Sequence, residues 1–513
     1  MTTPKVWLAL LLAVYTLFSA TESAASTMVG LLSFDSAAEQ SLTIPSTPDE
    51  QYWIAELQIP AGLLLHVVLV QETGSRVLAS YASGTEQLRF MSQNKASIRL
   101  QLANEWNDYD TPVRWSLSPI AVLPSPPVTG VSIEQVKSPQ LRQWIKEGNV
   151  PTHSPIIETL PGLPESERLM TFVYLGAKHN VRILGAPVND IVTLQKLVDS
   201  DVWFRSFTVP ADTLLSYRVA PDVPHLDANK RENRVAILSR ATVDPLNADV
   251  WPLDDDLIQY SRVDIASTVP LPNTPLDDQR LTRHWLHSHI FDNERLVTLY
   301  RPEARTSERP ERLVILLDGN EYEHKVAAAQ RIDQLYKSGL TEPLWLLLVN
   351  NPDAEARRNE LPANPLYADF IADELLPWAE QHAGQIFKRE QVIVAGSSYG
   401  GLAALSASLN RPDRVGHVLS MSGSFWWQGA GGSMQERLKS AEQLPLSVYL
   451  SAGKFETGRN DEAGIFEHNV DVAALLDARQ VSYKLTLLSA GHDYYSWSLA
   501  LEEGLTYLAG ERK

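Results

Sequence analysis

Apolar and polar positions follow two different periods along the chain. Between residues 45 and 118 they alternate, as in the stretches 52–59, 64–71, 96–102 and 113–117. Alternation with period two is typical of strands that bury one face, so this region predicts a small β-sandwich. No motif accompanies the alternation, which leaves a binding module or a passive spacer as its role and favours the spacer.

A different pattern begins at Arg295, where short apolar runs alternate with amphipathic helical segments such as 367–382 and 466–479. Strands and helices in this order form a mostly parallel sheet that helices cover on both faces. The sequence therefore predicts an α/β domain. Its expected strands are residues 296–300, 313–317, 344–349, 392–395, 418–421, 448–450 and 483–488.

The length of 513 residues exceeds one ordinary domain and suggests three. A proline-rich stretch at 123–127 stiffens the chain and blocks sheet pairing, which indicates a linker. Strands resume after it and predict a second sandwich, which turn residues at 244–247 close. The predicted parts are a signal peptide (1–25), a first β-sandwich (26–122), a linker (123–165), a second β-sandwich (166–270) and the α/β domain (280–513).

The first residues have the features of an export signal. Lys5 precedes the apolar run 6–18, and small residues at 23–25 form a cleavage site. The run is shorter than the roughly 20 residues of a transmembrane helix. We therefore expect cleavage after Ala25, a periplasmic or secreted protein, and no transmembrane segment after cleavage. The chain has no cysteine, which excludes disulfides and thiol chemistry.

A glycine-flanked serine stands between a predicted strand and a predicted helix. Gly396 and Gly400 enclose Ser398, the apolar run 391–395 precedes them, and an alanine-rich stretch at 402–409 follows. The G-x-S-x-G pattern in this context predicts a nucleophile elbow, a tight turn that exposes the serine hydroxyl at the end of the strand. Ser398 is therefore the candidate nucleophile.

The residues that would activate this serine follow later in the chain. In α/β-hydrolases the order is serine, then a carboxylate, then histidine. His492 lies on the loop after the predicted strand 483–488, and Glu456 follows the strand before it. We expect His492 to be the base and Glu456 its acid, with Asp461 and Glu462 as alternative acids.

Several further blocks of sequence are similar to one known family. The chain resembles the enterochelin (enterobactin) esterases of the esterase D-like α/β-hydrolases, over roughly residues 155–510. The elbow differs from that family at Ser397 and Tyr399, where the family pattern has Gln and Phe. This difference affects the lining of the pocket and leaves the catalytic chemistry intact. The similar blocks are residues 171–174, 201–204, 216–218 and 244–247 in the second sandwich, and 316–319, 358–362, 373–377, 422–427 and 491–493 in the α/β domain.

The hydrolase fold predicts where the oxyanion of the reaction is stabilised. One donor is the backbone N–H after the nucleophile, on Tyr399, and the other comes from the loop after an earlier strand. That loop is 318–321, in which Asn320 is the preferred donor and Glu321 the alternative. No step needs a metal or a cofactor, so we take His284, His287 and His289 as solvated strand residues and expect neither group.

The net charge of -18 disfavours nucleic acid as a partner and poses a question about an anionic substrate. A ferric catecholate is anionic, so its site needs local cations. Arg358 is the first choice because it stands in a block shared with the esterases, and the other candidates are Arg357, Arg459 and Arg301. Aromatic rings for stacking on aromatic acyl groups are Trp426, Trp427, Tyr494, Tyr495 and Trp497, of which Trp497 is expected to pack in the fold.

Together the residues and the resemblance predict a periplasmic serine esterase. Its expected substrate is the ester (trilactone) backbone of a catecholate siderophore such as enterobactin, ferric or iron-free, and its role would be to aid iron release. Two alternatives remain open. One is another serine carboxylesterase or acyltransferase of this fold, such as a feruloyl or acetyl esterase, because fold and triad do not set the substrate. The other is a non-catalytic siderophore-binding protein.

Overall fold

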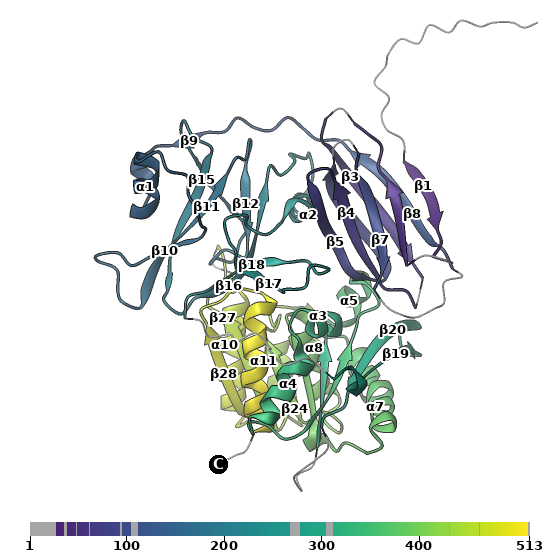
Figure 1. The fold of residues 1–513 in the computed structure, drawn as a ribbon. Helices are drawn as coiled ribbons and strands as arrows, with labels where there is room; N and C mark the ends of the chain where they lie inside the picture. Colours follow the sequence, from purple (N-terminus) through teal and green to yellow (C-terminus); the bar gives the residue numbers. More distant parts are fainter. Residues whose placement is uncertain are drawn as a thin grey trace, which may run out of the picture.

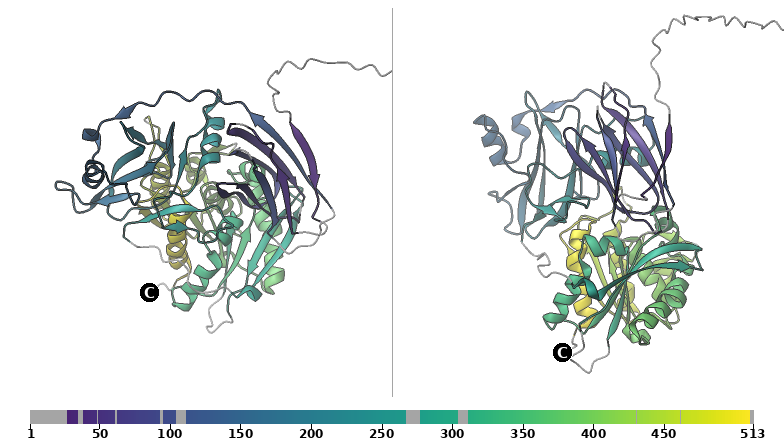
Figure 2. Two further views of the ribbon diagram at one scale, coloured as in Figure 1. Left: turned by 45° about the horizontal axis from the view of Figure 1, so that its top comes forward. Right: turned by 45° about the vertical axis from the view of Figure 1, so that its right-hand side comes forward.

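The computed structural model describes residues 27–34, 38–47, 49–60, 62–92, 95–103, 111–266, 277–303, 311–429, 431–460 and 462–510. The predicted signal peptide at 1–25 lies outside them. Two β-rich parts lie side by side above an α/β domain (Figure 1). The right-hand view of Figure 2 shows both on the same side of the α/β domain. No helix in the described ranges is long and apolar enough to cross a membrane.

The first part is a sandwich of two four-stranded antiparallel sheets, with strand orders β1-β8-β3-β6 and β2-β7-β4-β5. Alternate residues of β3, such as Trp53, Ala55 and Leu57, are fully buried between the sheets. This alternation predicted β3, β4, β7 and β8. The strands are β1 (Met28–Leu32), β2 (Glu39–Thr43), β3 (Gln51–Ile59), β4 (Leu65–Gln71), β5 (Gly74–Ala82), β6 (Gly84–Ser92), β7 (Ser97–Leu102) and β8 (Val113–Ile120).

The second part contains two five-stranded sheets, ordered β10-β11-β15-β14-β9 and β13-β12-β16-β18-β17. Phe172 and Tyr217 pack edge to face in the core between them, with ring centroids 4.9 Å apart. Its elements are β9 (Gly130–Val131), η1 (Ile133–Gln135), α1 (Pro139–Lys146), β10 (Ile156–Glu158), β11 (Glu167–Leu175), β12 (Val181–Leu184), β13 (Val192–Thr193), β14 (Gln195–Leu197), β15 (Val202–Pro210), β16 (Leu214–Pro221), α2 (Lys230–Arg240), β17 (Val250–Trp251) and β18 (Tyr260–Asp264).

The α/β domain is built on an eight-stranded sheet with the order β19-β20-β22-β21-β23-β24-β27-β28. The first two strands run antiparallel to their neighbours, and the strands from β22 to β28 are parallel. The strands are β19 (Leu281–Ser288), β20 (Asn293–Tyr300), β21 (Arg312–Leu317), β22 (Leu344–Val349), β23 (Val392–Ser397), β24 (His417–Met421), β27 (Ser447–Gly453) and β28 (Ser482–Leu488), beside a short hairpin of β25 (Gln428–Gly429) and β26 (Gly432–Ser433).

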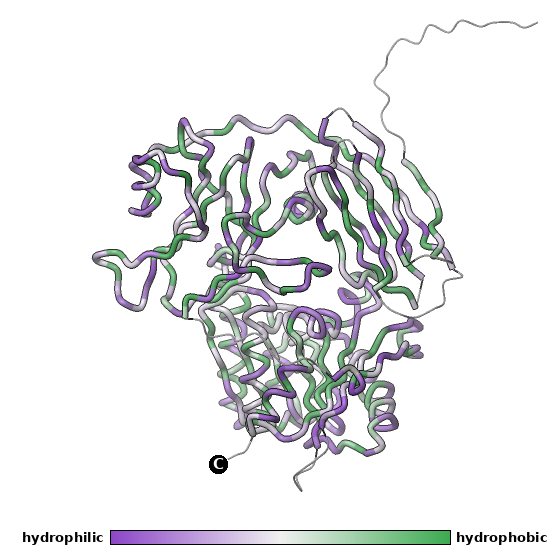
Figure 3. Tube along the Cα trace, viewed as in Figure 1, coloured by the Kyte–Doolittle hydropathy of each residue, from purple (hydrophilic) through white to green (hydrophobic). Residues whose placement is uncertain are grey.

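Helices cover both faces of this sheet because its strands are apolar on both sides. Within β21, Leu313 and Ile315 face a core made with helices α6 to α10, whereas Val314 and Leu316 face one made with α3, α4 and α11. Figure 3 shows the hydrophobic residues gathered along the central strands. The helices are η2 (Asp278–Arg280), α3 (Gly319–His324), α4 (Ala328–Lys337), α5 (Ala354–Glu360), α6 (Pro365–Asp369), the π-helix η3 (Phe370–Leu375), α7 (Leu376–Ala383), η4 (Arg389–Gln391), α8 (Tyr399–Asn410), α9 (Met434–Ser440), α10 (Ile465–Ala478) and α11 (Tyr494–Ala509).

The carboxyl ends of the parallel strands point toward the two sandwiches (Figure 1). Several hydrogen bonds join the parts there. Leu214 N–H of β16 donates to Ser489 O after β28, at 3.0 Å, and Tyr495 Oη of α11 donates to Asp264 Oδ2 of β18, also at 3.0 Å. In open α/β sheets ligands bind at the carboxyl ends of the strands. The loops after β21, β23, β27 and β28 therefore meet under the sandwiches, where a ligand would bind.

Candidate active site

Ser398 occupies a strained turn between β23 and α8. Its backbone angles are φ 56° and ψ -118°, a region that costs about 1–3 kcal/mol for a residue with a side chain. The flanking glycines permit the turn. A Cβ on Gly396 would lie 2.6 Å from the carbonyl carbon of Gly400, and one on Gly401 would lie 2.5 Å from Ser420 Oγ. The local geometry is that of the nucleophile elbow expected from the sequence.

His492 and Glu456 form a hydrogen-bonded pair at the neighbouring strand ends. His492 follows β28, Glu456 follows β27, and His492 Nδ1 contacts Glu456 Oε1. The carboxylate is 2% exposed, whereas the imidazole is 38% exposed. A hydrogen bond at Nδ1 fixes the tautomer and leaves Nε2 for proton transfer. Of the two alternative acids, Glu462 is exposed and Asp461 lies outside the described residues.

Two further residues hold the carboxylate of Glu456 in place. Ser422 Oγ donates to Glu456 Oε2 at 2.7 Å, and the Gly453 N–H donates to the same oxygen at 2.6 Å. Trp497 Nε1 donates to Ser422 Oγ at 3.0 Å, and its ring packs edge-on against the His492 imidazole at 4.8 Å between centroids. Trp497 is therefore buried, as expected, but it also orients the pair.

The hydroxyl of Ser398 lies 3.3 Å from Ser424 Oγ. In the part of the chain that is described, no hydrogen bond joins Ser398 to His492. Catalytic hydrogen bonds are often long or misaligned in ligand-free structures and tighten in the substrate complex. The structure thus brings His492 and Glu456 into contact. The Ser398 hydroxyl instead contacts the hydroxyl of Ser424, a residue that was not among the candidates from the sequence.

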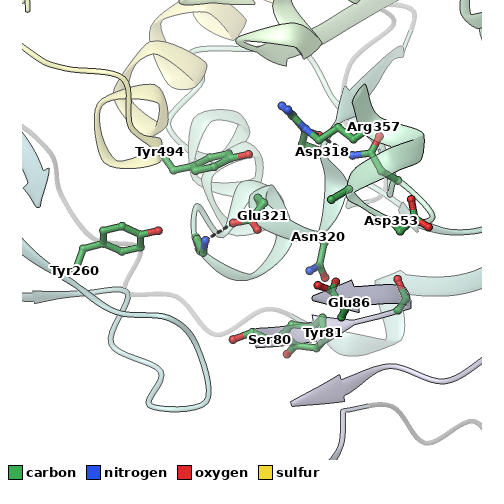
Figure 4. Close-up of a pocket in the computed structure, with 14 residues that line it drawn as sticks. Ser80, Tyr81, Glu86, Tyr260, Asp318, Asn320, Glu321, Asp353, Arg357 and Tyr494 are labelled. Atoms are coloured by element: carbon green, nitrogen blue, oxygen red, sulfur yellow. Dashed lines mark hydrogen bonds and ion pairs between the residues drawn. The ribbon is translucent and has the colours of Figure 1, made fainter. Parts of the chain in front are cut away.

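The two expected oxyanion donors belong to the first turns of helices. Tyr399 is the first residue of α8, and Asn320 is the second residue of α3. N–H groups in a first helical turn lack intrahelical acceptors and favour negative charge. The side chain of Asn320 points away from the sheet, toward Glu86 of the first sandwich (Figure 4). If Asn320 binds an oxyanion, the donor is therefore its backbone.

Arg357 and Arg358 lie on helix α5. Arg357 makes a bidentate ion pair with the buried Asp318, with both N–O distances 2.7 Å. The Asp318 charge holds the pKa of Arg357 well above its ordinary value. Arg358 is exposed and does not line the cavity described below. Arg357, not Arg358, is thus the arginine of this block that faces the site, and its charge is already paired.

The two other candidate cations, Arg459 and Arg301, do not line the cavity described below. Arg459 pairs with Asp190 of the second part, at 2.9 Å. Arg301 follows β20, which runs antiparallel to β22 with Val297 beside Val349 and Tyr300 beside Leu346. The carboxyl end of β22 is therefore at the Val297 side, and Arg301 lies at the opposite edge of the sheet. Its predicted role in substrate binding is wrong because sequence pattern does not give strand direction.

The aromatic residues fall into two groups. Tyr399, Trp426 and Trp427 form a cluster directly after the nucleophile, with ring centroids 5.7 to 6.2 Å apart. Trp426 is 43% exposed, so a ring face is open to a ligand. Tyr494 lines the cavity, whereas Tyr495 is fully buried and bonded to the second part. Tyr495 is therefore not part of the pocket lining.

A cavity of about 420 Å³ lies next to Tyr494, and Ser398, Glu456 and His492 are not among the residues that line it. All three parts of the chain contribute to it, as Figure 4 shows. It reaches the first turn of α3 at Asn320 and the start of α11 at Tyr494, two residues after His492. Its lining residues are Ser80, Tyr81, Ser83, Glu86, Tyr260, Asp318, Asn320, Glu321, Lys325, Asn351, Asp353, Ala354, Arg357 and Tyr494.

The charges of this cavity are mostly paired. Lys325 Nζ contacts Glu321 Oε2, and it lies 5.6 Å from the ring centroids of Tyr260 and Tyr494. Burial is the largest single influence and lowers the pKa of Lys325, but the charge of Glu321, the charge of Tyr260 and the hydrogen bond to Glu321 together raise it above its ordinary value. Burial raises the pKa of Glu86 to about 7, and the charge of Asp353 adds to that effect.

Among the described residues, no cluster of three or more metal-ligand side chains is found. His287 and His289 lie with ring centroids 5.0 Å apart on the β19 edge, and His287 Nδ1 is 3.3 Å from Glu294. His284 packs edge-on against Trp378 at 5.2 Å. These histidines therefore lie at the edge of the sheet near β19, where their partners are neighbouring side chains of the same domain.

Comparison with known proteins gives two family matches. The family described as "Enterochelin esterase, N-terminal" matches residues 169–279, and the family described as "Putative esterase" matches residues 288–508. Both matches begin after the first sandwich. The chain from residue 169 onward is therefore similar to two families that follow one another in this order.

Relatives and solved structures agree with these matches. Iron(III) enterobactin esterase of Escherichia coli is 29% identical over 337 residues, which cover 61% of this chain and 80% of that protein. Iron(III) enterobactin esterase of Dickeya dadantii is 27% identical over 356 residues, covering 62% and 79%. The crystal structure of an enterobactin esterase from Shigella flexneri in the presence of enterobactin has a TM-score of 0.56 at 25% identity, covering 73% of this chain and 98% of that one.

Proposed function

The chain belongs to the enterochelin esterase family and is a carboxylic-ester hydrolase, and from this premise we propose that it cleaves the ester backbone of a catecholate siderophore such as enterobactin. The observation that carries the proposal is the hydrogen-bonded pair of His492 and Glu456 at the strand ends next to the Ser398 elbow. Similarity to iron(III) enterobactin esterases supports the choice of substrate.

In the proposed reaction Ser398 Oγ attacks the ester carbonyl carbon. His492 Nε2 takes the hydroxyl proton, and Glu456 stabilises the imidazolium that forms. The imidazolium then protonates the departing alkoxide, which leaves an acyl group on Ser398. A water molecule, deprotonated by His492, attacks this acyl-enzyme and releases the acid. Before the attack, the Ser398 side chain must rotate so that its hydroxyl turns away from Ser424 Oγ.

The negative charge on the carbonyl oxygen needs hydrogen-bond donors during both attacks. We assign this role to the backbone N–H groups of Tyr399 and Asn320, which begin α8 and α3. Removing one such donor costs about a hundredfold in rate in other hydrolases. Because both donors belong to the backbone, the turn geometry at Ser398 and at Asp318 sets their positions.

The aromatic cluster next to Ser398 supports an aromatic acyl group. The exposed face of Trp426, beside Tyr399 and Trp427, is suited to stack on a dihydroxybenzoyl ring. An acetyl group offers no ring to such a surface. A feruloyl group does, so a feruloyl esterase is the alternative that the test below must separate.

We further propose that the protein acts in the periplasm and aids iron release there. The apolar run at 6–18 and the small residues at 23–25 support export. Hydrolysis of the trilactone shortens the chelator and separates its catechol units, which weakens its hold on iron by lowering the effective concentration of the ligands. Cell fractionation with an antibody to the chain tests the location, and recovery in the cytoplasm would contradict it.

The substrate is tested by product analysis. Purified protein is incubated with ferric enterobactin, iron-free enterobactin, a feruloyl ester and simple acetyl esters, and products are identified by mass spectrometry. We expect linear oligomers of dihydroxybenzoyl-serine from at least one form of enterobactin, and none with the Ser398→Ala variant. Efficient cleavage of the feruloyl or acetyl ester with intact enterobactin would overturn the proposal.

A further inference from the structure

A second cavity, of about 390 Å³, lies between the first sandwich and the second part. Residues of β4, β5 and β7 line it from the first sandwich, and residues of β16 and of the segments 242–243 and 255–259 line it from the second part. The two parts lie side by side above the α/β domain (Figure 1). None of its lining residues belongs to the cavity at α3 and α11, so it is a separate feature of the interface between these two parts.

Two arginines line this cavity from opposite sides, Arg76 of β5 and Arg218 of β16. Both are half-buried, and both also line a smaller neighbouring cavity of about 280 Å³. Among the described residues neither guanidinium has an ion-pair partner, and no carboxylate contributes to the pKa shift of either. The interface therefore holds two positive charges without a negative charge of the protein between them.

Neutral groups hold Arg218 in place without cancelling its charge. Its Nη2 donates to the backbone oxygen of Ala241, and its guanidinium carbon lies 5.7 Å from the centroid of the Tyr260 ring. Its Nε is buried and has no hydrogen-bond partner among the described residues. A buried donor without a partner is costly. Arg218 is thus fixed at the cavity with part of its donor capacity unused.

The surroundings of both arginines disfavour their charge. Burial, followed by the charges of Arg218 and Arg240, lowers the pKa of Arg76, and burial lowers the pKa of Arg218. Arginine nevertheless keeps its proton at neutral pH. Arg240 is paired with Glu50 at 2.7 Å. The charges that remain uncompensated at this interface are therefore those of Arg76 and Arg218.

The other charged residues of the cavity do not neutralise these two arginines. Asp255 Oδ1 accepts from Gln259 Nε2 at 3.1 Å. Among the described residues neither Asp255 nor Asp256 makes an ion pair, although both line the cavity. A third arginine of the lining, Arg99, lies 3.9 Å from Glu39, which is outside the lining. The cavity thus has an excess of positive charge in a chain whose net charge is -18.

We propose that this cavity is a binding site for a compact oxyanion of the phosphate class, held between the guanidinium groups of Arg76 and Arg218. Such an ion has several oxygens around one centre and accepts from both groups at once, whereas a carboxylate has two oxygens and matches one group. The hydroxyl groups of Ser75 and Thr242 line the same cavity and can also donate. The inference goes beyond the proposed function and does not depend on it.

The bound ion joins the first sandwich to the second part, because Arg76 and Arg218 belong to different parts of the chain. Without the ion the two positive charges repel each other across the interface, and with it both are attracted to the same negative centre. The first sandwich then shares a ligand site. This is the binding role that its sequence left open beside that of a passive spacer.

Isothermal titration calorimetry with inorganic phosphate tests the site in the full chain, at constant ionic strength so that general screening is equal throughout. The proteins compared are the wild type, Arg76→Gln, Arg218→Gln and Arg114→Gln. Arg114 is an exposed arginine of β8 in the same sandwich and lines neither cavity at this interface, so its variant has the same charge change elsewhere.

We expect about one phosphate per chain in the wild type and in Arg114→Gln. Affinity should fall about tenfold or more in Arg76→Gln and in Arg218→Gln, because each loses charged hydrogen bonds to the ion. No saturable binding of phosphate by the wild type, or equal affinity in all four proteins, would overturn the inference.

Thermal unfolding separates loss of the site from a folding defect. In phosphate-free buffer Arg76→Gln should melt at or above the wild-type temperature, because it removes one of two repelling charges. Phosphate should raise the melting temperature of the wild type and of Arg114→Gln but not that of Arg76→Gln. A lower melting temperature of Arg76→Gln without phosphate would show that Arg76 already has a partner in the protein and would refute the site.

Two further ligands in the same unfolding assay test the chemical class of the ion. Acetate should raise the wild-type melting temperature less than phosphate does, and an equal rise would exclude the phosphate class. Glycerol 3-phosphate distinguishes the source of the group. A rise equal to that with phosphate supports a phosphorylated molecule as the occupant, and no rise supports the free ion.

Discussion

The hydroxyl of Ser422 offers a sharp test of how the acid of the site is held. Replacing Ser422 by alanine removes its 2.7 Å hydrogen bond to Glu456 Oε2 and the acceptor of Trp497 Nε1. The Gly453 N–H, at 2.6 Å, then remains on that oxygen. Alanine tolerates the backbone at this position as well as serine does, since both carry a Cβ at φ 48°.

The expected size of the effect follows from the type of bond. A hydrogen bond to a charged group contributes about 1.5–3 kcal/mol. If that energy orients the Glu456–His492 pair in the transition state, kcat should fall by roughly tenfold to a hundredfold, because 1.4 kcal/mol corresponds to a factor of ten. KM should change little, since Ser422 is 1% exposed and cannot touch substrate.

Steady-state kinetics on enterobactin or an aryl ester measure this effect. Ser451→Ala is a matched control, because Ser451 is a buried serine of β27 whose hydroxyl has no hydrogen-bond partner among the described residues. The control should retain wild-type kcat. Equal losses in the two variants would show that general packing, not the hydrogen bond to Glu456, sets the rate, and would refute the reasoning.

Three further predictions concern charged groups. Arg357→Ala leaves the buried Asp318 without its ion-pair partner and should lower the free energy of unfolding by about 3 kcal/mol in denaturant unfolding. The variant of its exposed neighbour, Arg358→Ala, should change that free energy by no more than about 0.5 kcal/mol, and similar losses in the two variants would contradict the pairing. Glu456→Gln should lower kcat by about a thousandfold and the exposed Glu462→Gln should not, and the reverse would move the acid. Burial raises the pKa of Glu86 from 4.5 to about 7, so the stability from its folded-state proton is fully present below pH 4.5 and is lost as the pH rises to 7. From pH 5 to pH 7 the wild type should lose more stability than Glu86→Gln in denaturant unfolding, by up to about 1.4 kcal/mol per pH unit, and parallel losses would contradict the shift.

The pattern of apolar residues predicted the strands whose side chains are mostly buried in the core. The seven mostly apolar runs expected as strands of the α/β domain coincide with β20 to β24, β27 and β28. The edge strand β19 was not among them because its arginine and histidines face solvent or neighbouring side chains. Strand β5, which connects to β6 of the opposite sheet, was missed for a similar reason. Most positions of β5 are only half-buried, so its sequence does not alternate.

The sequence predicted the site residues whose place follows from the order of the strands. It did not predict side-chain contacts between segments that lie far apart in the sequence. Ser398, Glu456 and His492 follow strands whose carboxyl ends meet at one edge, and the structure places Glu456 on His492. Ser422 and Ser424 lie in the block 422–427 that resembles the esterases, but the local sequence does not indicate that they contact Glu456 and Ser398. The pairing of Arg357 with Asp318 joins helix α5 to the residue before α3, and nothing in either local sequence indicates it.

The central claim is that Ser398 carries the acyl group of the siderophore during turnover. The most direct measurement is mass spectrometry of peptides from the protein, quenched in acid during hydrolysis of iron-free enterobactin. We predict a dihydroxybenzoyl-serine adduct on the peptide that contains Ser398, absent from Ser398→Ala, which should also fail to release product. Product release by Ser398→Ala at the wild-type rate, with no adduct on that peptide in the wild type, would contradict the claim.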